Sequence, residues 1–309
     1  MKLSFDQKVN WPTVGKYVVA VSGGVDSVVL LHLLASSGKK YDLIPAYIDH
    51  GWRDTAVEQR LVRNLSEHLH LELQTGALKL KTKSEDEARK GRYLALEDIR
   101  KSSNALAIIT AHHMDDRLET SIMNVLRGTN RYGLAPLHST DKVIRPLLNV
   151  KKSELATYAK NHNLAWCSDP TNLDSAYRRN QVRNQLLPKL RQKNKDFDAN
   201  YRHIMTEAEK LNAEIDRQLA GLTTVSRGKA ELDRAELKNL SLPVARHALV
   251  FMARRADPAA ELDAMTVHQA ALQLKTGRLR GGRKLTSSLL ITISNDKITI
   301  VSNPVKSVK

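Results

Sequence analysis

Short apolar runs alternate with amphipathic stretches through the first two thirds of the chain. Residues 17–21 are β-branched or aromatic apart from one alanine, which is typical of a buried parallel strand. The runs at 43–48 and 105–110 predict two further strands, and the apolar residues of 28–34 recur at helical spacing. Further helices are expected at about 54–68, 84–94 and 153–161. This alternation predicts an α/β domain with a doubly wound, mostly parallel sheet.

The pattern changes after about residue 195. Helical spacing then dominates, at about 201–222, 234–239, 242–255 and 262–274. Residues 284–293 and 297–301 alternate around a polar turn, which predicts a β-hairpin. We therefore expect two domains, one over residues 1–195 and a smaller, mainly helical one over residues 196–309 that ends in the hairpin.

A glycine-rich loop joins the first strand to the first long helix. Gly23 and Gly24 follow Ser22 and precede Val25, so backbone N–H groups at the helix N-terminus can approach an anion such as phosphate. Asp26 stands where the common phosphate loop has a lysine. A carboxylate beside phosphates is repulsive unless a divalent cation bridges them, which suggests Mg²⁺ held between Asp26 and a nucleotide. Asp26 and Ser27 are also common helix caps, which is the simpler interpretation.

A second polar cluster follows the 105–110 strand. Asp116 and Glu119 are three residues apart at an expected helix start, so their carboxylates share one face. His112 and His113 precede them, but neighbouring side chains of an extended segment point in opposite directions, which disfavours a histidine metal site. The acidic pair is better suited to contact Mg²⁺, to accept a cationic substrate, or only to cap the helix.

The chain is strongly basic. Its 49 Lys and Arg against 33 Asp and Glu give a net charge of +16, which favours a polyanionic partner such as a nucleic acid, although a generally basic proteome has the same effect. Arg89 and Arg92 lie within one helical turn, and Arg179 and Arg183 lie in a run without acids. These four are candidate RNA or phosphate contacts, and a solvated basic face is the alternative.

Cysteine and apolar content exclude some classes of protein. Cys167 is the only cysteine, so a disulfide within the chain, a cysteine-based zinc site and a two-cysteine sulfur relay are excluded. The chain has no apolar run of about 18 residues and no apolar N-terminal core. We therefore expect a cytoplasmic protein without a membrane partner.

The order of the motifs carries a family resemblance. The string Ser-Gly-Gly-x-Asp-Ser at Ser22 to Ser27 resembles the PP-loop ATP pyrophosphatases. Residues 18–190 as a whole resemble the tRNA(Ile)-lysidine synthase family, because five further motifs follow this string in the same order as in that family. They are Asp-His-Gly-x-Arg, Ala-Arg-x-x-Arg-Tyr, Ala-His-His-x-Asp-Asp-x-x-Glu-Thr, Arg-Pro-Leu-Leu and Asp-Pro-x-Asn-x-x-x-x-Tyr-x-Arg-Asn-x-x-Arg. Two features depart from the family pattern: Arg117-Leu118 stand in place of Gln-Ala, and the chain ends before the extra C-terminal domain of long members. The second departure indicates the short architecture or a shortened chain.

The resemblance implies a C–N ligase. ATP would adenylate the C2 oxygen of the wobble cytidine in the CAU anticodon of an isoleucine tRNA, and the amine of free L-lysine would displace AMP to give lysidine. It implies ATP on residues Ser22, Gly23, Gly24, Val25, Asp26 and Ser27. It also implies Mg²⁺ on Asp26 and Asp116, and lysine on Asp116 and Glu119, so the expected catalytic residues are Asp26, Asp116 and Glu119.

The same resemblance implies that tRNA contacts Arg89, Arg92, Arg179 and Arg183, that the second domain helps to bind it, and that a homodimer is compatible with the fold. Three alternatives stay open. A PP-loop amidotransferase shares only the first motif, a PP-loop tRNA thiolase needs more cysteines than this chain has, and a non-enzymatic RNA-binding protein leaves Asp26 and the acidic pair unexplained.

Overall fold

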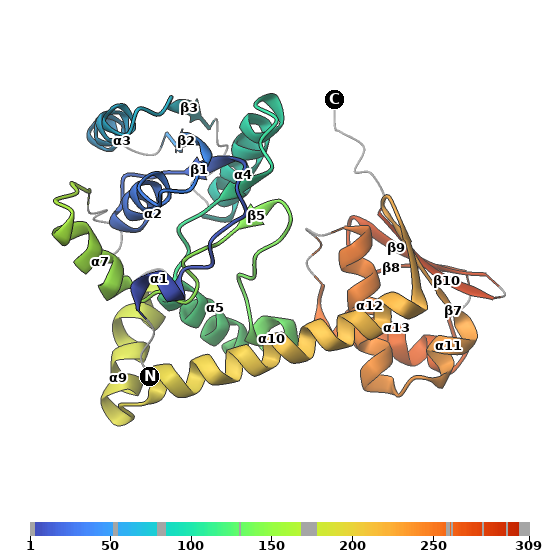
Figure 1. Ribbon diagram of the computed structural model, residues 1–309. Coiled ribbons are helices and arrows are strands. Elements are labelled where there is room, and N and C mark those ends of the chain that lie inside the picture. Colours follow the sequence, from blue (N-terminus) through green and yellow to red (C-terminus); the bar gives the residue numbers. More distant parts are fainter. Residues whose placement is uncertain are drawn as a thin grey trace. The chain divides into compact units, whose positions relative to one another are not determined.

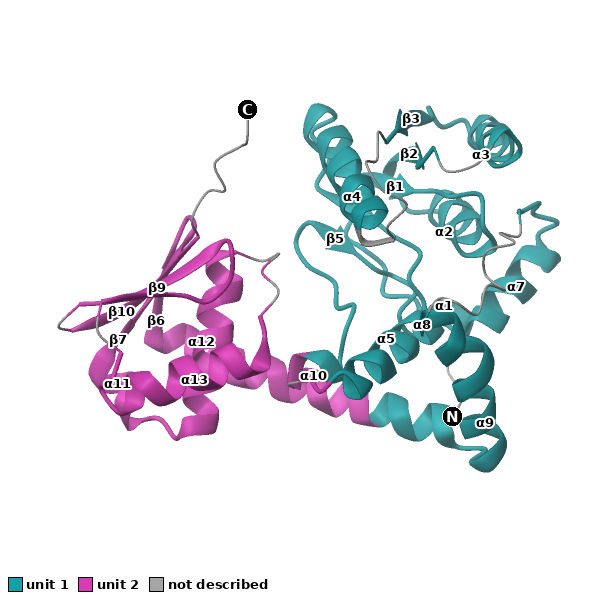
Figure 2. Cartoon of the chain, turned by 180° about the vertical axis from the view of Figure 1, so that it is seen from behind, with its two compact units in different colours: residues 1–127, 133–203 teal, residues 128–132, 204–309 magenta. Residues whose placement is uncertain are grey.

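The computed structural model describes residues 4–51, 55–78, 85–129, 131–167, 178–257, 260, 262–279, 281–294 and 296–302. The chain forms two compact units (Figure 2), residues 1–127 with 133–203 and residues 128–132 with 204–309. Each unit is described here by itself.

The first unit is built on a parallel five-stranded sheet. Its strands are β1 (Lys16–Ala20), β2 (Asp42–Asp49), β3 (Gln74–Ala77), β4 (Ala107–Ile109) and β5 (Val143–Ile144). They follow the order β3-β2-β1-β4-β5, and every neighbouring pair is parallel. The central strand β1 is buried because β2 and β4 pair with it on both sides, and the strand order reverses beside it. Ligands of open α/β sheets bind at such a reversal, at the carboxyl ends of the strands.

Helices cover both faces of this sheet (Figure 1). They are α2 (Val25–Ala35), α3 (Ala56–His68), α4 (Glu85–Ser102) and α7 (Lys152–Asn161). Alternation along β1 explains the two layers. Tyr17 and Val19 belong to the apolar core that also contains α2 and α7, whereas Val18 packs with Leu96 of α4 in the other core. The expected doubly wound α/β architecture is thereby confirmed.

The polar second half of the first unit contains α5 (Met114–Leu126), α8 (Arg178–Gln181), a π-helical turn (Val182–Leu186, called η2) and α9 (Leu187–Lys193). α8, η2 and α9 follow one another without a break, so they form one continuous helical stretch that is locally widened. Pro188 lies in the first turn of α9. Its missing N–H removes one helical hydrogen bond and its ring crowds the preceding turn, which accounts for the wider turn before it.

The second unit combines helices with a sheet that is larger than the predicted hairpin. The end of α10 (Phe197–Leu222), α11 (Arg234–Asn239), α12 (Leu242–Ala256) and α13 (Ala264–Lys275) are its main helices. Its strands are β6 (Thr223–Ser226), β7 (Lys229–Asp233), β8 (Gly282–Lys284), β9 (Leu289–Ile293) and β10 (Lys297–Ser302). They form an antiparallel sheet in the order β6-β7-β10-β9-β8, with the expected hairpin as β9 and β10.

The core of the second unit lies between this sheet and α12. Ile298 and Ile300 of β10 and Leu232 of β7 are fully buried, and they join Leu249 and Met252 of α12 in one apolar cluster. Within the described part of the chain, no helix combines the length and the apolar character that a membrane span requires.

Candidate active site

The loop after β1 has a backbone that only glycine adopts easily. Gly23 has a φ of +84°, and a Cβ placed there would lie 3.2 Å from Cβ of Glu58, so both conformation and space exclude a larger side chain. Gly24 is the N-cap of α2 and has no side chain to compete for the free N–H groups of the first turn. The loop therefore presents unhindered backbone donors at the positive end of an 11-residue helix, as an anion site requires.

Two hydroxyl groups hold the loop in shape. The Ser27 hydroxyl donates to the carbonyl of Gly24 at 2.9 Å and accepts the backbone N–H of Ser22 at 3.1 Å. The two serine Oγ atoms lie 3.2 Å apart. At the other end, the N–H of Cys167 donates to the carbonyl of Gly23 at 2.9 Å. The cradle is thus fixed before any ligand binds, and Cys167 serves it through its backbone.

Asp26 lies in the first turn of α2, directly beside the loop. Its Oδ2 atom lies 3.5 Å from Nε2 of His113. Its Oδ1 atom is buried, and within the described ranges no group donates a hydrogen bond to it. A buried carboxylate oxygen without a donor is costly unless something binds to it. The residue therefore fits the binding of a cation next to a phosphate.

His113 connects Asp26 to the acidic helix face. It is the N-cap of α5, only 1% exposed, and its Nδ1 accepts the backbone N–H of Asp116 at 3.4 Å. Its Nε2 lies 3.4 Å from Asp116 Oδ2 as well as beside Asp26. Burial alone would lower the pKa of His113, but the hydrogen bond to Asp26 and the charge of Asp116 raise it above the usual value. A proton on Nε2 is thus shared between two carboxylates.

His112 behaves in the opposite way, although it is the neighbouring residue. Its Nδ1 lies 2.9 Å from the Thr110 hydroxyl. Burial, only partly opposed by Asp116, lowers the pKa of His112 to about 3. The two rings therefore have different partners, His112 beside Thr110 and His113 beside Asp26 and Asp116, and their pKa values shift in opposite directions.

Asp116 and Glu119 project from one face of α5 and both bind arginine side chains. The Arg179 guanidinium donates to Asp116 Oδ1 at 2.6 Å and to Glu119 Oε2 at 2.9 Å. Arg183 donates through Nε to Glu119 Oε1 at 2.6 Å and through a terminal nitrogen to Oε2 at 2.9 Å. Glu119 is 1% exposed. The acidic face therefore binds two cationic groups.

The cationic groups around Asp116 lower the pKa of its carboxyl group. Burial alone would raise the pKa of its carboxyl group, but the charges of His113 and Arg179 lower it below the usual value. Arg179 and Arg183, predicted as RNA contacts, are paired with carboxylates of the acidic face. Their role toward RNA stays a prediction, and the structure adds that they border the acidic face.

Asp115 faces away from Arg179 and Arg183, because it is adjacent to Asp116 and adjacent positions on a helix are about 100° apart. It accepts the backbone N–H of Lys152 at 2.9 Å and the Arg191 guanidinium at 2.8 Å. Burial alone would raise the pKa of Asp115, but these hydrogen bonds lower it. Asp115 therefore anchors α7 and α9 against α5.

Arg89 and Arg92 lie on α4, on the other side of the sheet from α2. A terminal nitrogen of Arg92 lies 2.7 Å from Nε2 of His50, which directly follows β2. Arg89 lies over the Tyr93 ring at 5.4 Å, and its charge lowers the pKa of His112. Both are therefore near the carboxyl edge of the sheet. Arg53 of the Asp-His-Gly-x-Arg motif, Ser84 at the expected start of the 84–94 helix and the segment 168–177 lie outside the described residues.

Sequence reasoning did not name His113 as a site residue. The signal was limited to two adjacent histidines before an acidic helix start, and only the fold shows which of them reaches Asp26. Among the described residues, no group of three or more His, Cys, Asp or Glu side chains is arranged as a metal site. Mg²⁺ is usually bound through one or two carboxylates together with phosphates, so Asp26 and Asp116 still fit such an ion beside a nucleotide.

Comparison with known proteins follows the same division of the chain. Residues 1–190 match the model of the PP-loop domain family. The tRNA(Ile)-lysidine synthase of Nitrosomonas europaea is 34% identical over 248 residues, which cover 73% of this chain and 53% of that protein. The tRNA(Ile)-lysidine synthase of Synechococcus sp. is 35% identical over 221 residues, which cover 69% of this chain and 67% of that protein.

Several curated relatives are much longer than the matched region, and the chain spans about half the length of the Nitrosomonas protein. Among solved structures, the U34-tRNA thiolase NcsA from Methanococcus maripaludis has a TM-score of 0.54 and 18% identity, covering 68% of this chain and 75% of that one. This likeness concerns the fold alone, and it agrees with the parallel sheet and loop described above.

Proposed function

We propose, from the finding that the chain belongs to the PP-loop domain family and within it to the tRNA(Ile)-lysidine synthases, that it ligates lysine to an isoleucine tRNA. The ligation would be driven by cleavage of ATP to AMP and pyrophosphate. The reaction is the formation of lysidine at the wobble cytidine of the CAU anticodon. The observation that carries the proposal is the convergence of the glycine loop, Asp26, His113 and the Asp116–Glu119 face in one unit.

In the first step, the C2 oxygen of the cytidine attacks the α-phosphorus of ATP, and pyrophosphate leaves. The backbone donors at Gly23 and Gly24 hold the β- and γ-phosphates at the start of α2, where the helix dipole stabilises negative charge. Asp26 and Asp116 would hold Mg²⁺, which when bound would neutralise charge on the departing pyrophosphate. His113 keeps these two carboxylates close together by placing Nε2 between them.

In the second step, the lysine ε-amine attacks C2 of the adenylated base, a C–N bond forms and AMP leaves with the former C2 oxygen. The amine must lose a proton to become a nucleophile, and a carboxylate of Asp116 or Glu119 is suited to accept it. Both carboxylates bind guanidinium groups, which supports their use as a site for a primary ammonium. Lysine would compete there with Arg179 and Arg183.

The second unit and the arginines are proposed to bind the tRNA. Release of Arg179 and Arg183 from the carboxylates would free two guanidinium groups for phosphate contacts. The net charge of +16 supports a polyanionic substrate. A homodimer stays an expectation of the family resemblance.

Turnover of ATP to AMP distinguishes this function from its rivals. We expect release of pyrophosphate to require the isoleucine tRNA, and release of AMP to require lysine as well. An amidotransferase would form AMP without tRNA, and an RNA-binding protein would form none. A tRNA thiolase would depend on a sulfur donor instead of lysine, and the single cysteine of the chain argues against it.

A further inference from the structure

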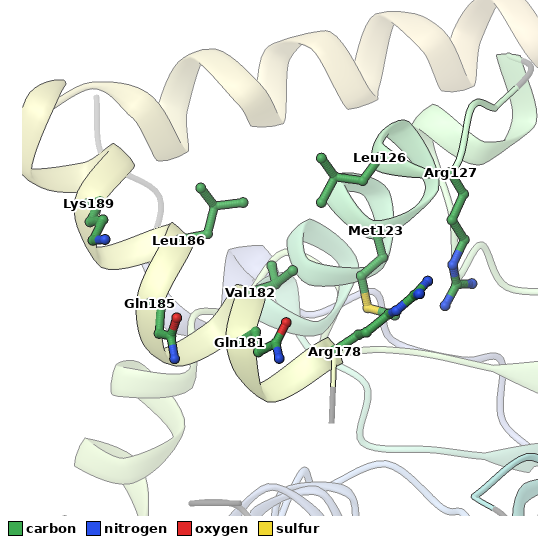
Figure 3. A pocket seen from close by; sticks show the side chains of 9 residues that line it. All are labelled: Met123, Leu126, Arg127, Arg178, Gln181, Val182, Gln185, Leu186 and Lys189. Carbon is green, nitrogen blue, oxygen red and sulfur yellow. The ribbon is translucent and has the colours of Figure 1, made fainter. Parts of the chain in front are cut away.

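A pocket of about 450 Å³ lies between the C-terminal half of α5 and the continuous stretch α8–η2–α9, within the first unit. Figure 3 shows that its lining side chains come from these two helical stretches and from the residue that follows α5. Its volume lies in the range of small-molecule sites. None of the residues used in the reaction above lines it.

The charge of the pocket is one-sided. Arg127, Arg178 and Lys189 line it and all three are exposed, whereas none of the described residues that line it is acidic. Such a lining attracts an anionic ligand and repels a cationic one. A phosphate diester beside the pocket would therefore be stabilised.

The floor of the pocket is apolar and two amides stand beside it. Met123, Leu126 and Val182 supply the apolar surface, and Leu126 is 69% exposed. Gln181 lines the same pocket from the end of α8, and Gln185 lines it from η2. An apolar floor, adaptable amide donors and acceptors, and planar guanidinium groups are the features that bind an unpaired nucleobase by stacking and by its edge.

Residues that line the pocket alternate in the sequence with residues that bind the acidic face. Arg179 and Arg183 bind Glu119, while their neighbours Arg178 and Val182 line the pocket. One helical stretch therefore has the acidic face on one side and the pocket on another. A helix is about 10–12 Å across with its side chains, so both sites are within reach of one unpaired strand.

We propose that this pocket holds a second unpaired base of the RNA substrate, near the base that reacts, with its phosphate on Arg178 and Lys189. The inference rests on the proposed function, because the reacting base is the wobble cytidine of an anticodon loop. It adds a subsite that selects the loop by a base that is not itself modified.

The test combines pocket variants with abasic RNA. The probe is an anticodon stem-loop with a CAU anticodon, together with the same RNA made abasic at each unpaired position in turn. For the parent chain, removing one base other than the wobble cytidine should weaken binding about tenfold. In the Gln181→Ala/Gln185→Ala variant, the intact RNA should bind about tenfold more weakly, and the abasic change should cost nothing further.

Two matched controls remove exposed cations from other helices of the same unit. Arg63→Ala in α3 and Lys160→Ala in α7 should keep the tenfold effect of the abasic position. Thermal unfolding of each variant should match the parent, because the changed side chains are exposed. If the abasic effect persisted in full in the pocket variant, or if the parent bound every abasic RNA equally, the subsite would be refuted.

Lysine incorporation into the same stem-loop separates this inference from the proposed function. Incorporation without any coupling between pocket and base would refute the subsite alone. Coupling without incorporation would support an RNA subsite and refute the proposed reaction. Failure of the parent to bind the stem-loop would refute both.

Discussion

Glu119 accepts a 2.6 Å hydrogen bond from Nε of Arg183, a residue 64 positions later in the chain. The carboxylate is nearly inaccessible to solvent, and Arg179 binds it as well. A buried acid that already holds cationic groups is suited to receive the ammonium group of a substrate, provided that the resident guanidinium groups can move aside. The chemistry proposed for the second step depends on this exchange.

Asp26→Asn should abolish AMP formation and leave tRNA affinity nearly unchanged. The change keeps the shape of the side chain and removes the negative charge that would hold a divalent cation beside the phosphates. Pyrophosphate release and tRNA binding measured on the same preparation test this. Pyrophosphate production at near the parent rate would show that Asp26 has no such role.

Gly23→Ala should raise the Kd for ATP about tenfold. Its φ of +84° and the close approach of Glu58 disfavour a Cβ, and strain of this kind costs about 1–3 kcal/mol. Gly38→Ala is the matched control, because that glycine also has a positive φ of +70° but has nothing within 4 Å. Equal ATP affinity of the two variants, measured by calorimetry, would contradict a phosphate-binding loop at Gly23.

Glu119→Gln should spare adenylation more than lysine transfer, so that adenylated tRNA accumulates. The amide keeps the size of the side chain but cannot neutralise an ammonium group or accept its proton. Analysis of the tRNA after a single turnover provides the measurement. If both steps slowed equally, Glu119 would act only through the packing of Arg179 and Arg183.

Neutralising Arg179 and Arg183 together should weaken tRNA binding and make it less sensitive to salt. The log–log slope should fall by about one unit for each RNA phosphate that the protein no longer binds. ATP binding should stay the same. The control pair is Arg278 with Arg280 of the second unit, of which Arg280 lies outside the described residues. An unchanged affinity and slope would limit the two arginines to holding the acidic face.

His112 should stay neutral from pH 8 to pH 5, since burial lowers its pKa to about 3. The unfolded chain takes up a proton at this residue near pH 6.5 and the folded chain does not, so its contribution to stability falls as the pH decreases below about 6.5. The fall approaches about 1.4 kcal/mol per pH unit. Histidine NMR spectra, assigned with His112→Asn, should show no titration of this ring between pH 8 and pH 5, and a midpoint near 6.5 would contradict the lowered pKa.

The sequence predicted the parts of the fold that have strong local signals. The apolar run of β1 and the glycines after it are enough to identify a strand, a loop and a helix. β3 was not predicted because it is polar and largely exposed, and β5 was not predicted because it has only two residues. β7 was not predicted because only two of its residues, Ala230 and Leu232, are buried.

The site was predictable as residue types but not as a set of contacts. Asp116 and Glu119 share a face because they are three apart on a helix, which spacing alone shows. Their arginine partners lie 60 or more positions away, and a basic run without acids suggests exposure to solvent or RNA instead. His113 could not be distinguished from His112 because only the tertiary structure buries His113 beside two carboxylates and places His112 beside Thr110.

Incubation of the protein with total tRNA, ATP and labelled L-lysine, followed by nucleoside analysis, tests the proposed ligation most directly. We expect a single labelled nucleoside, lysidine, from an isoleucine tRNA with a CAU anticodon, and one molecule of AMP released for each lysine incorporated. Formation of AMP without any labelled nucleoside would contradict the proposed ligation.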